Sequence, residues 1–398
     1  MAATYLLRHA WQLDGWHHND ELAHVDYVFR LAHEQRWPRS QDKVSRELVE
    51  FSAHRFGYPR PDDLSLPDYG IGLQAFSYEA HQPPLYYLML ALPEALFHRL
   101  GCALDFRLRA LRLFTVVLML AGWGLFFHAL RPLVFRGFIP SSQAWLATGL
   151  LAFFSAADHY HISNDQAGLL WGSLLTRQCL LMGFRPSATR GAWALATALL
   201  ATATKASNAL WLLPILGLGL SAVYTGLVSF RDWLHWRRLI ALWPLLLWLP
   251  ALMSPDAKGP LSETSRLFSI ISPGLFDSSF FLQAFMSKAM DFAPLGLRSG
   301  PGWPLLLLAL QALAALLWTY LTPPLLRFNP GLWWLMVLWP LVILAAGYLN
   351  QHVGSVFWFE FRIFSSYYPL LILFLLLPWP LWRRLMVPGG QKPCLPPS

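Results

Sequence analysis

Long apolar runs separated by short polar breaks fill the sequence from about Arg112 onward. Hydrophobic residues make up 56% of the 398-residue chain and charged residues only 13%, about half the charged share of an average soluble domain. A bilayer accepts such runs as helices of about 20 residues. The sequence therefore predicts an all-α polytopic membrane protein. It excludes a disordered chain, a coiled coil and a secreted disulfide scaffold.

Nine of the runs are candidate transmembrane spans, and we expect a bundle of about nine helices over residues 112–385, with an external loop at 254–302. Residues 1–111 would form a non-cytoplasmic polar head, and residues 386–398 a short cytoplasmic tail. The candidate spans are residues 112–130, 142–157, 164–183, 190–205, 207–228, 238–253, 303–322, 331–349 and 364–382.

The segment Pro83–Arg99 has two interpretations. Its apolar run is too short to cross about 30 Å of hydrocarbon, so it is either a strained span or an amphipathic helix at the interface. If it is interfacial, the arginine-bearing breaks all lie on one side, which the positive-inside rule makes cytoplasmic. If it spans, the Arg231–Arg238 cluster lies outside. We favour the interfacial interpretation, which makes this a juxtamembrane helix of the external head.

The bulk charge and the cysteines indicate no further site. The net charge of +8 is modest, and the basic residues lie mostly in loops between apolar runs, which is typical of membrane topology and not of nucleic-acid binding. Cys102, Cys179 and Cys394 are isolated and show no metal or redox spacing.

The first polar group is His17-His18-Asn19-Asp20-Glu21-Leu22-Ala23-His24. On a helix, two adjacent acids followed by a His three and four residues later share one face. Such a set suits a divalent cation or a general base. A solvated polar turn before an acidic helix start is the alternative interpretation.

The second group runs from Tyr78 to Tyr87 and contains Glu79, His81 and Gln82. A pair of prolines before an apolar run fixes the start of a helix, and the tyrosine pair suits the headgroup zone. Glu79 and His81 would then lie at the membrane surface. A plain interfacial anchor explains the same pattern.

The third group is the break from Asp158 to Asp165. Asn164 and Asp165 are suited to capping the following helix. Asp158 and His161 are candidates for function, because ionisable groups at the ends of spans often mark sites.

Two basic residues follow. Lys205 lies between two spans, where it either snorkels to the headgroups or meets a phosphate. Arg362, in Phe359-Glu360-Phe361-Arg362, either pairs with Glu360 at the interface or makes bidentate phosphate contacts. On the favoured topology all five groups lie on the non-cytoplasmic side. That placement suits group transfer from a lipid carrier better than it suits a pore.

The order of these pieces resembles the GT-C superfamily of polytopic glycosyltransferases, especially its bacterial mannosyltransferase-like and aminoarabinose-transferase-like members. The resemblance covers most of residues 14–370, and His81-Gln82-Pro83-Pro84-Leu85-Tyr86-Tyr87 is its most specific piece. The other matching elements are Asp20-Glu21 with His24, Glu79-Ala80, Leu108–Phe114, Ser163-Asn164-Asp165, Thr204–Ser207 and Phe361–Phe364.

The resemblance implies an inverting transfer of a sugar from a polyprenyl- or dolichyl-phosphate donor to a glycan, lipid or protein acceptor. The reaction would occur on the non-cytoplasmic face of the plasma (inner) membrane. Asp20 is the first candidate for the base and Glu21 the second. Lys205 and Arg362 would hold the donor phosphate, a leaving group that needs charge stabilisation. Asp158 would lie opposite the first-loop acids.

No cofactor is implied with certainty. In some members of the superfamily the first-loop acid also reaches a metal, which makes a divalent cation a candidate, with Asp20, Glu21 and His24 as its ligands. The superfamily normally has a transmembrane helix before this loop, whereas residues 1–15 here carry Arg8, His9 and Asp14. We therefore expect that the natural start lies upstream or that this helix is lost. A flippase or transporter of lipid-linked saccharides and a non-catalytic assembly protein are the alternative functions.

Overall fold

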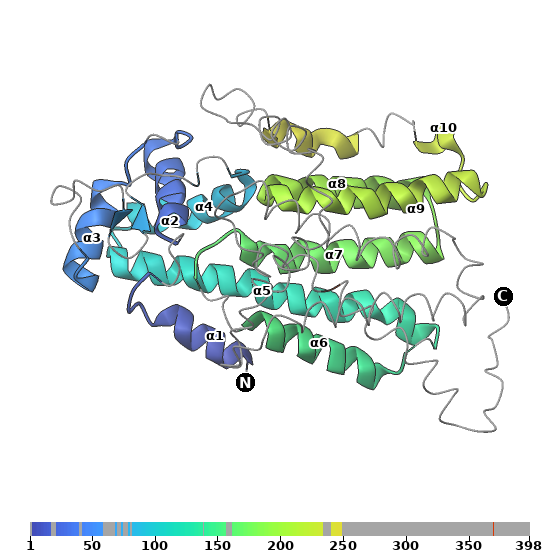
Figure 1. Cartoon of the computed structure of the whole chain (residues 1–398), viewed down its shortest axis with the longest axis horizontal. Helices are drawn as coiled ribbons and strands as arrows, with labels where there is room; N and C mark the ends of the chain where they lie inside the picture. The colour runs from blue at the N-terminus through green and yellow to red at the C-terminus, as the bar shows by residue number, and fades with distance from the viewer. Residues whose placement is uncertain are drawn as a thin grey trace, which may run out of the picture.

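The structure is a computed structural model. It describes residues 2–16, 21–39, 42–58, 68–69, 73–74, 79, 82–137, 139–156, 161–233, 240–248 and 369. These residues are mostly helical (Figure 1), as the sequence predicts. The exceptions to helix include a short antiparallel pair of strands, β1 (Asp68–Tyr69) and β2 (Leu73–Gln74). The predicted spans 303–322 and 331–349, the 254–302 loop, the 386–398 tail and all of 364–382 except Pro369 lie outside the described residues.

The body of the molecule is a row of long helices lying side by side (Figure 1). They are α5 (Leu104–Phe135), α6 (Ser141–Ala156), α7 (Asp165–Phe184), α8 (Ala188–Thr204) and α9 (Leu212–Tyr224), followed by the short α10 (Phe230–Trp233). A 3₁₀ segment (Ala206–Trp211) joins α8 to α9, and a second covers Ile240–Trp248. The core between these helices is apolar and includes Phe126, Leu169 and Trp211.

Helices α6, α7 and α8 match the predicted ranges 142–157, 164–183 and 190–205 to within two residues at each end, and the other body helices differ more. Helix α5 begins eight residues before the predicted span 112–130, because Asp105, Arg107 and Arg109 extend the helix beyond the apolar run. The predicted span 207–228 is split into a 3₁₀ segment and α9, and the described part of 238–253 is 3₁₀ helix containing Pro244.

Length and hydropathy qualify α5, within the described part of the chain, as the one helix able to cross a membrane, and α9 is a shorter apolar helix. Helices α6 and α8 have 16 and 17 residues, or about 25 Å at 1.5 Å per residue, and α7 contains Arg177 and Gln178. The coarse expectation of a mostly helical protein is therefore confirmed for the described residues. The described helices do not support the finer expectation of about nine spans.

The head is a second cluster of shorter helices at one end of the body (Figure 1). It contains α2 (Glu21–Phe29), a π-helix (Arg30–Glu34), α3 (Arg46–Phe56) and α4 (Leu85–Arg99). Every residue of α2 is buried. Helix α1 (Ala2–Trp11) packs instead against α5 and α6, where Leu6 and Ala10 join the core of the body.

Helix α4 starts directly after Pro84, at the point that the proline pair predicts. It packs against α2, the π-helix and α5, burying Tyr86, Tyr87 and Leu90, while Leu92 and Leu96 are exposed. Helix α4 is part of the head, and the choice between an interfacial helix and a strained span stays a prediction.

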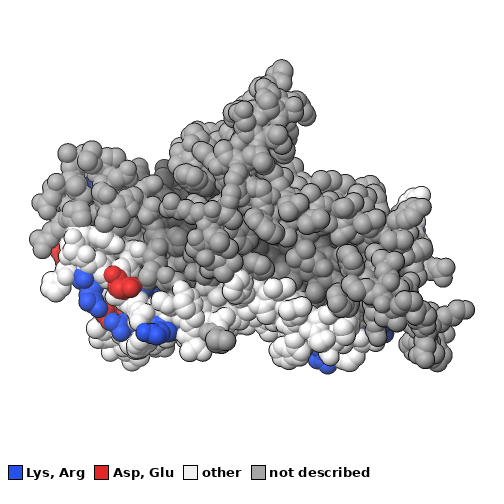
Figure 2. Space-filling view, turned by 60° about the horizontal axis from the view of Figure 1, so that its bottom comes forward, with Lys and Arg blue, Asp and Glu red and all other residues white. Residues whose placement is uncertain are grey.

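The chain direction places the breaks between body helices at two opposite ends. The breaks at 161–164 and 205–206 lie at the head end, and those at 136–140, 185–187 and 225–229 lie at the far end (Figure 1). Figure 2 shows acidic and basic atoms over the head, a largely uncharged surface along the visible part of the body, and basic atoms again near the far end.

Candidate functional site

A buried ion pair joins the head to the body. Oε1 and Oε2 of Glu21, the first residue of α2, accept hydrogen bonds of 2.8 and 2.6 Å from Nε and Nη2 of Arg112 in α5. Neither side chain has any exposed surface. Arg112 also donates to the backbone oxygens of Gln12 and Gly15. One arginine therefore holds both the start of α2 and the segment that precedes it.

Glu21 also reaches the break between α6 and α7. Its Oε1 accepts a 2.9 Å hydrogen bond from the backbone N–H of Ile162. The carboxylate thus holds donors from two distant segments, and its surface is closed to solvent. This geometry suits an anchor that sets the position of the first loop better than it suits a base that must meet an acceptor.

The second cluster of polar groups lies around Tyr87 of α4. Nδ1 of His24 and the Tyr87 hydroxyl are hydrogen-bonded at 2.8 Å. The ring of Tyr27 stacks on that of Tyr87 with centroids 3.8 Å apart. Buried Oε2 of Glu79 lies 4.0 Å from Nδ1 of His24 and has no hydrogen-bond partner among the described residues. The cluster therefore brings together His24 of the first predicted group and Glu79 of the second.

Tyr27 acts here as a neutral hydrogen-bond donor. Its hydroxyl donates to the backbone oxygen of Gln82 at 3.3 Å. Burial, and then the charge of Glu79, raise the pKa of Tyr27 far above its usual value. The phenol therefore keeps its proton and links α2 to the residues just before α4.

A further set of contacts joins Gln82 to the ends of α7 and α8. Nδ2 of Asn164 donates to Oε1 of Gln82 at 3.2 Å and to the backbone oxygen of Thr204 at 3.4 Å. Lys205, directly after Thr204, forms an ion pair with Asp165. The side chain of Lys205 is 12% exposed and that of Asp165 is 7% exposed. The second, third and fourth predicted groups therefore meet at the head end of the body.

The structure changes the interpretation of the third group. Asn164 occupies the N-cap position of α7, but its side chain makes no capping hydrogen bond, because it binds Gln82 and Thr204 instead. Asp165 pairs with Lys205. His161 is buried, and its ring Nε2 lies 3.4 Å from the amide Nε2 of Gln166, five residues later in the chain. The capping interpretation of Asn164 is therefore wrong.

Five predicted site residues lie outside the described residues, and their roles stay predictions: Asp20, His81, Asp158, Glu360 and Arg362. The described candidates that do come together at the head end are Glu21, His24, Glu79, Gln82, His161, Asp165 and Lys205.

The predicted cation site finds little support in its described ligands. No three His, Cys, Asp or Glu side chains gather as a metal site in the part of the chain that the structure describes. The Glu21 carboxylate is already occupied by Arg112 and the Ile162 N–H, and an adjacent guanidinium disfavours a cation. We therefore derive no chemical step through a metal.

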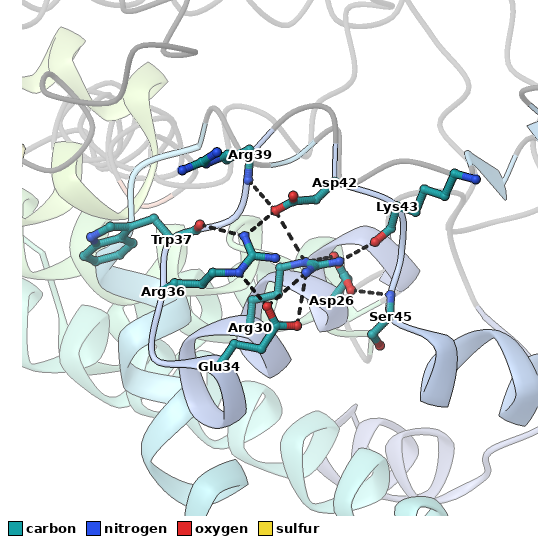
Figure 3. Close-up of polar contacts among 9 residues, drawn as sticks. All are labelled: Asp26, Arg30, Glu34, Arg36, Trp37, Arg39, Asp42, Lys43 and Ser45. Carbon is teal, nitrogen blue, oxygen red and sulfur yellow. Dashed lines mark hydrogen bonds and ion pairs between the residues drawn. The ribbon is translucent and has the colours of Figure 1, made fainter.

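A network around Arg30 supports α2 from its C-terminal side (Figure 3). Nε of Arg30 donates to Oδ2 of Asp26 at 2.9 Å, Nη1 donates to Glu34, and Nη2 to the backbone oxygen of Lys43. Oδ1 of Asp26 accepts from the Ser45 N–H at 2.7 Å. These contacts fix α2 to the segment that leads into α3.

Asp42 extends this network to Arg36 (Figure 3). Its Oδ2 accepts from Nη1 of Arg36 at 2.6 Å and from the Arg39 N–H at 2.8 Å. Burial alone would raise the pKa of Asp42, but these hydrogen bonds and the charge of Arg30 outweigh it, so the pKa lies below its usual value.

A second buried charge cluster joins α4 to α5. Nη1 of Arg107 donates to Oε1 of Glu94 at 2.6 Å and is hydrogen-bonded to Nδ1 of His98 at 2.9 Å, while Nη2 pairs with Glu47 of α3. Nε2 of His33 lies 3.0 Å from Oε1 of Glu94. We did not predict this cluster. Its sequence signal is Glu94 and His98, which lie one turn apart after the apolar first half of α4.

Sequence reasoning also missed the partners that position the candidates. Arg112 marks only the start of an apolar run in the sequence, and its partner Glu21 lies 91 residues away. Tyr27 gives no signal of its own within a short apolar segment. The one sequence indication of these partners was the single charge of Arg112 at the start of an apolar run.

No family model, curated protein or solved structure matches this chain.

Proposed function

We propose that the chain is a multi-pass membrane glycosyltransferase that uses a lipid-phosphate sugar donor at the head end of its body. The full helix bundle would resemble the GT-C type, with about nine transmembrane helices. The acceptor would be a glycan, a lipid or a protein, and the head end would face the non-cytoplasmic side of the plasma (inner) membrane.

The observation that carries the proposal is the meeting of four predicted polar groups at the head end. Glu21 is hydrogen-bonded to the 161–165 break, and that break contacts Gln82, Thr204 and Lys205. In the sequence, Glu21 and Lys205 are 184 residues apart. The convergence of these groups at helix ends supports a site at a membrane surface over a conduction path, in which ionisable groups would line the middle of the bundle.

Glu21 and Asp20 would have different roles. The buried Glu21–Arg112 pair supports a positioning role for Glu21, since neither side chain is accessible to an acceptor. Asp20 is then the better candidate for the general base that accepts the proton of the acceptor hydroxyl. Lys205 would stabilise the charge that develops on the departing lipid phosphate, and it would exchange part of its contact with Asp165 for that phosphate.

Reconstitution into proteoliposomes tests the proposal. Vesicles would hold the full chain, radiolabelled polyprenyl-phosphate sugars and candidate acceptors, and the readout would be release of polyprenyl phosphate with formation of glycosylated product. Movement of the donor across the bilayer without any transfer product would identify a flippase instead. Neither transfer nor movement, together with capture of one partner protein, would favour an assembly role.

A further inference from the structure

At the far end of the body, the end of α5, the end of α7 and the start of α8 carry arginines and no Asp or Glu. Residues 106–157 and 166–231 contain no Asp or Glu. The helix bounds place five arginines of these stretches toward the far end: Arg131, Arg136, Arg177, Arg185 and Arg190. In the described ranges no carboxylate pairs with Arg131, Arg177, Arg185 or Arg190. The positive charge of these four arginines is therefore not balanced by an ion pair with a described acid.

Three helices bring part of this charge into one place. The guanidinium carbon of Arg136, at the end of α5, lies 4.5 Å from the ring centroid of Phe184 at the end of α7. Arg185 follows Phe184 directly, and Nη1 of Arg190 in α8 donates to the backbone oxygen of Arg185. Burial, and then the positive charge of Arg185, lower the pKa of Arg136. Arg136, Arg185 and Arg190 thus form a cluster of like charges, which we name the arginine cluster.

The arginine cluster is bordered by exposed apolar side chains. Phe135 is 76% exposed and Trp193 of α8 is 65% exposed. Phe135 directly precedes Arg136, and Trp193 lies one turn from Arg190. A free phosphate ion would need only the charges. A phospholipid has a phosphate for the arginines and acyl chains for the apolar surface beside them.

We propose that the arginine cluster binds the phosphodiester of an anionic phospholipid in the leaflet at the far end. The proposal rests on the membrane setting of the proposed function and adds a lipid site opposite the transfer site. The guanidinium fork of each arginine matches two phosphate oxygens, and basic pockets between helices at this side of a bilayer bind anionic headgroups. The bound lipid would offset the repulsion between the three arginines.

Thermal unfolding of the detergent-solubilised full chain tests this site. Phosphatidylglycerol is expected to raise the midpoint, phosphatidylcholine of the same acyl length is not, and inorganic phosphate at equal concentration is not. For Arg185→Gln/Arg190→Gln we expect phosphatidylglycerol affinity, measured by native mass spectrometry, to fall about tenfold or more. Arg46→Gln removes an exposed arginine of the head and is the matched control, with wild-type affinity expected.

Two results would overturn the lipid site. One is wild-type phosphatidylglycerol affinity in the double Gln variant. The other is equal stabilisation by inorganic phosphate, which would assign the cluster to a soluble anion. If the double Gln variant fails to fold, Arg185→Lys/Arg190→Lys replaces it, because this variant keeps both charges and loses the guanidinium forks. We expect its phosphatidylglycerol affinity to be weaker than that of wild type but stronger than nonspecific binding. Undiminished binding would contradict the proposal. Binding is measured without sugar donor, so a failed transfer assay leaves this test intact.

Discussion

The carboxylate of Glu21 and the guanidinium of Arg112 meet through two hydrogen bonds of 2.8 and 2.6 Å, and both side chains are completely buried. This pair connects α2 to α5, and through Ile162 it also connects α2 to the start of α7. The geometry of the first loop therefore depends on a contact between residues 91 positions apart.

Removing one partner of this pair should destabilise the folded protein. Glu21→Gln would leave the Arg112 charge buried without its counter-ion, and we expect a loss of about 3–5 kcal/mol of stability. The double variant Glu21→Leu/Arg112→Met should lose less than the sum of its single variants. Equilibrium unfolding in detergent measures wild type, Glu21→Gln, the double variant and the two single variants Glu21→Leu and Arg112→Met. Additive losses would show that the pair is not coupled.

Lys205 should matter more for transfer than for folding. We expect Lys205→Gln to lower kcat by about 100-fold or more, because the leaving phosphate loses its charge partner. Lys205→Gln/Asp165→Asn removes both charges of the ion pair and should recover stability without recovering transfer. Lys43→Gln is the matched control, since only the backbone oxygen of Lys43 takes part in the Arg30 network. Recovery of transfer in the double variant would mean that Lys205 acts only through folding.

The Asp42 network predicts a definite pH dependence. Because the folded-state pKa of Asp42 is lowered, its contribution to stability is complete above the unfolded value of about 3.9 and is lost as the pH falls through the folded value. The unfolding midpoint of wild type should exceed that of Asp42→Asn at pH 6, and the gap should shrink below about pH 4. A gap that stays constant down to pH 2.5 would contradict this assignment.

Close packing of α5 on α7 gives a test within the body. A Cβ at Gly122 would lie 2.9 Å from backbone atoms of Leu169 and Leu170, and small residues allow helices to approach this closely. We expect Gly122→Ala to cost about 1–3 kcal/mol. Gly124, two residues along, has open space where its Cβ would be, so Gly124→Ala should be neutral or stabilising. Equal effects of the two changes on the unfolding midpoint would speak against this helix contact.

The sequence was a good guide to helices and to the end of the molecule at which polar groups gather. Apolar runs predicted the centres of α5 to α8, and the proline pair predicted the start of α4. The start of α5 was not predicted, because its charged first turns continue the helix beyond the apolar run.

The partners within the site were not predictable from sequence for a physical reason. Asn164 has a side chain suited to capping, but tertiary contacts to Gln82 and Thr204 compete with the cap and win. Arg107 and Arg112 look alike in the sequence, yet one pairs with Glu94 and Glu47 and the other with Glu21. Long-range pairing of charges depends on packing, which a local pattern does not encode.

The most direct test of the proposed function is the single-turnover rate of sugar transfer by Asp20→Asn in proteoliposomes, compared with Asp14→Asn. Asp14 is an exposed acid of the same loop region, so its variant controls for charge and folding. We predict a fall of about 10²–10⁴-fold for Asp20→Asn, the size of a general-base contribution, and an unchanged rate for Asp14→Asn. Full transfer activity in Asp20→Asn would contradict the account.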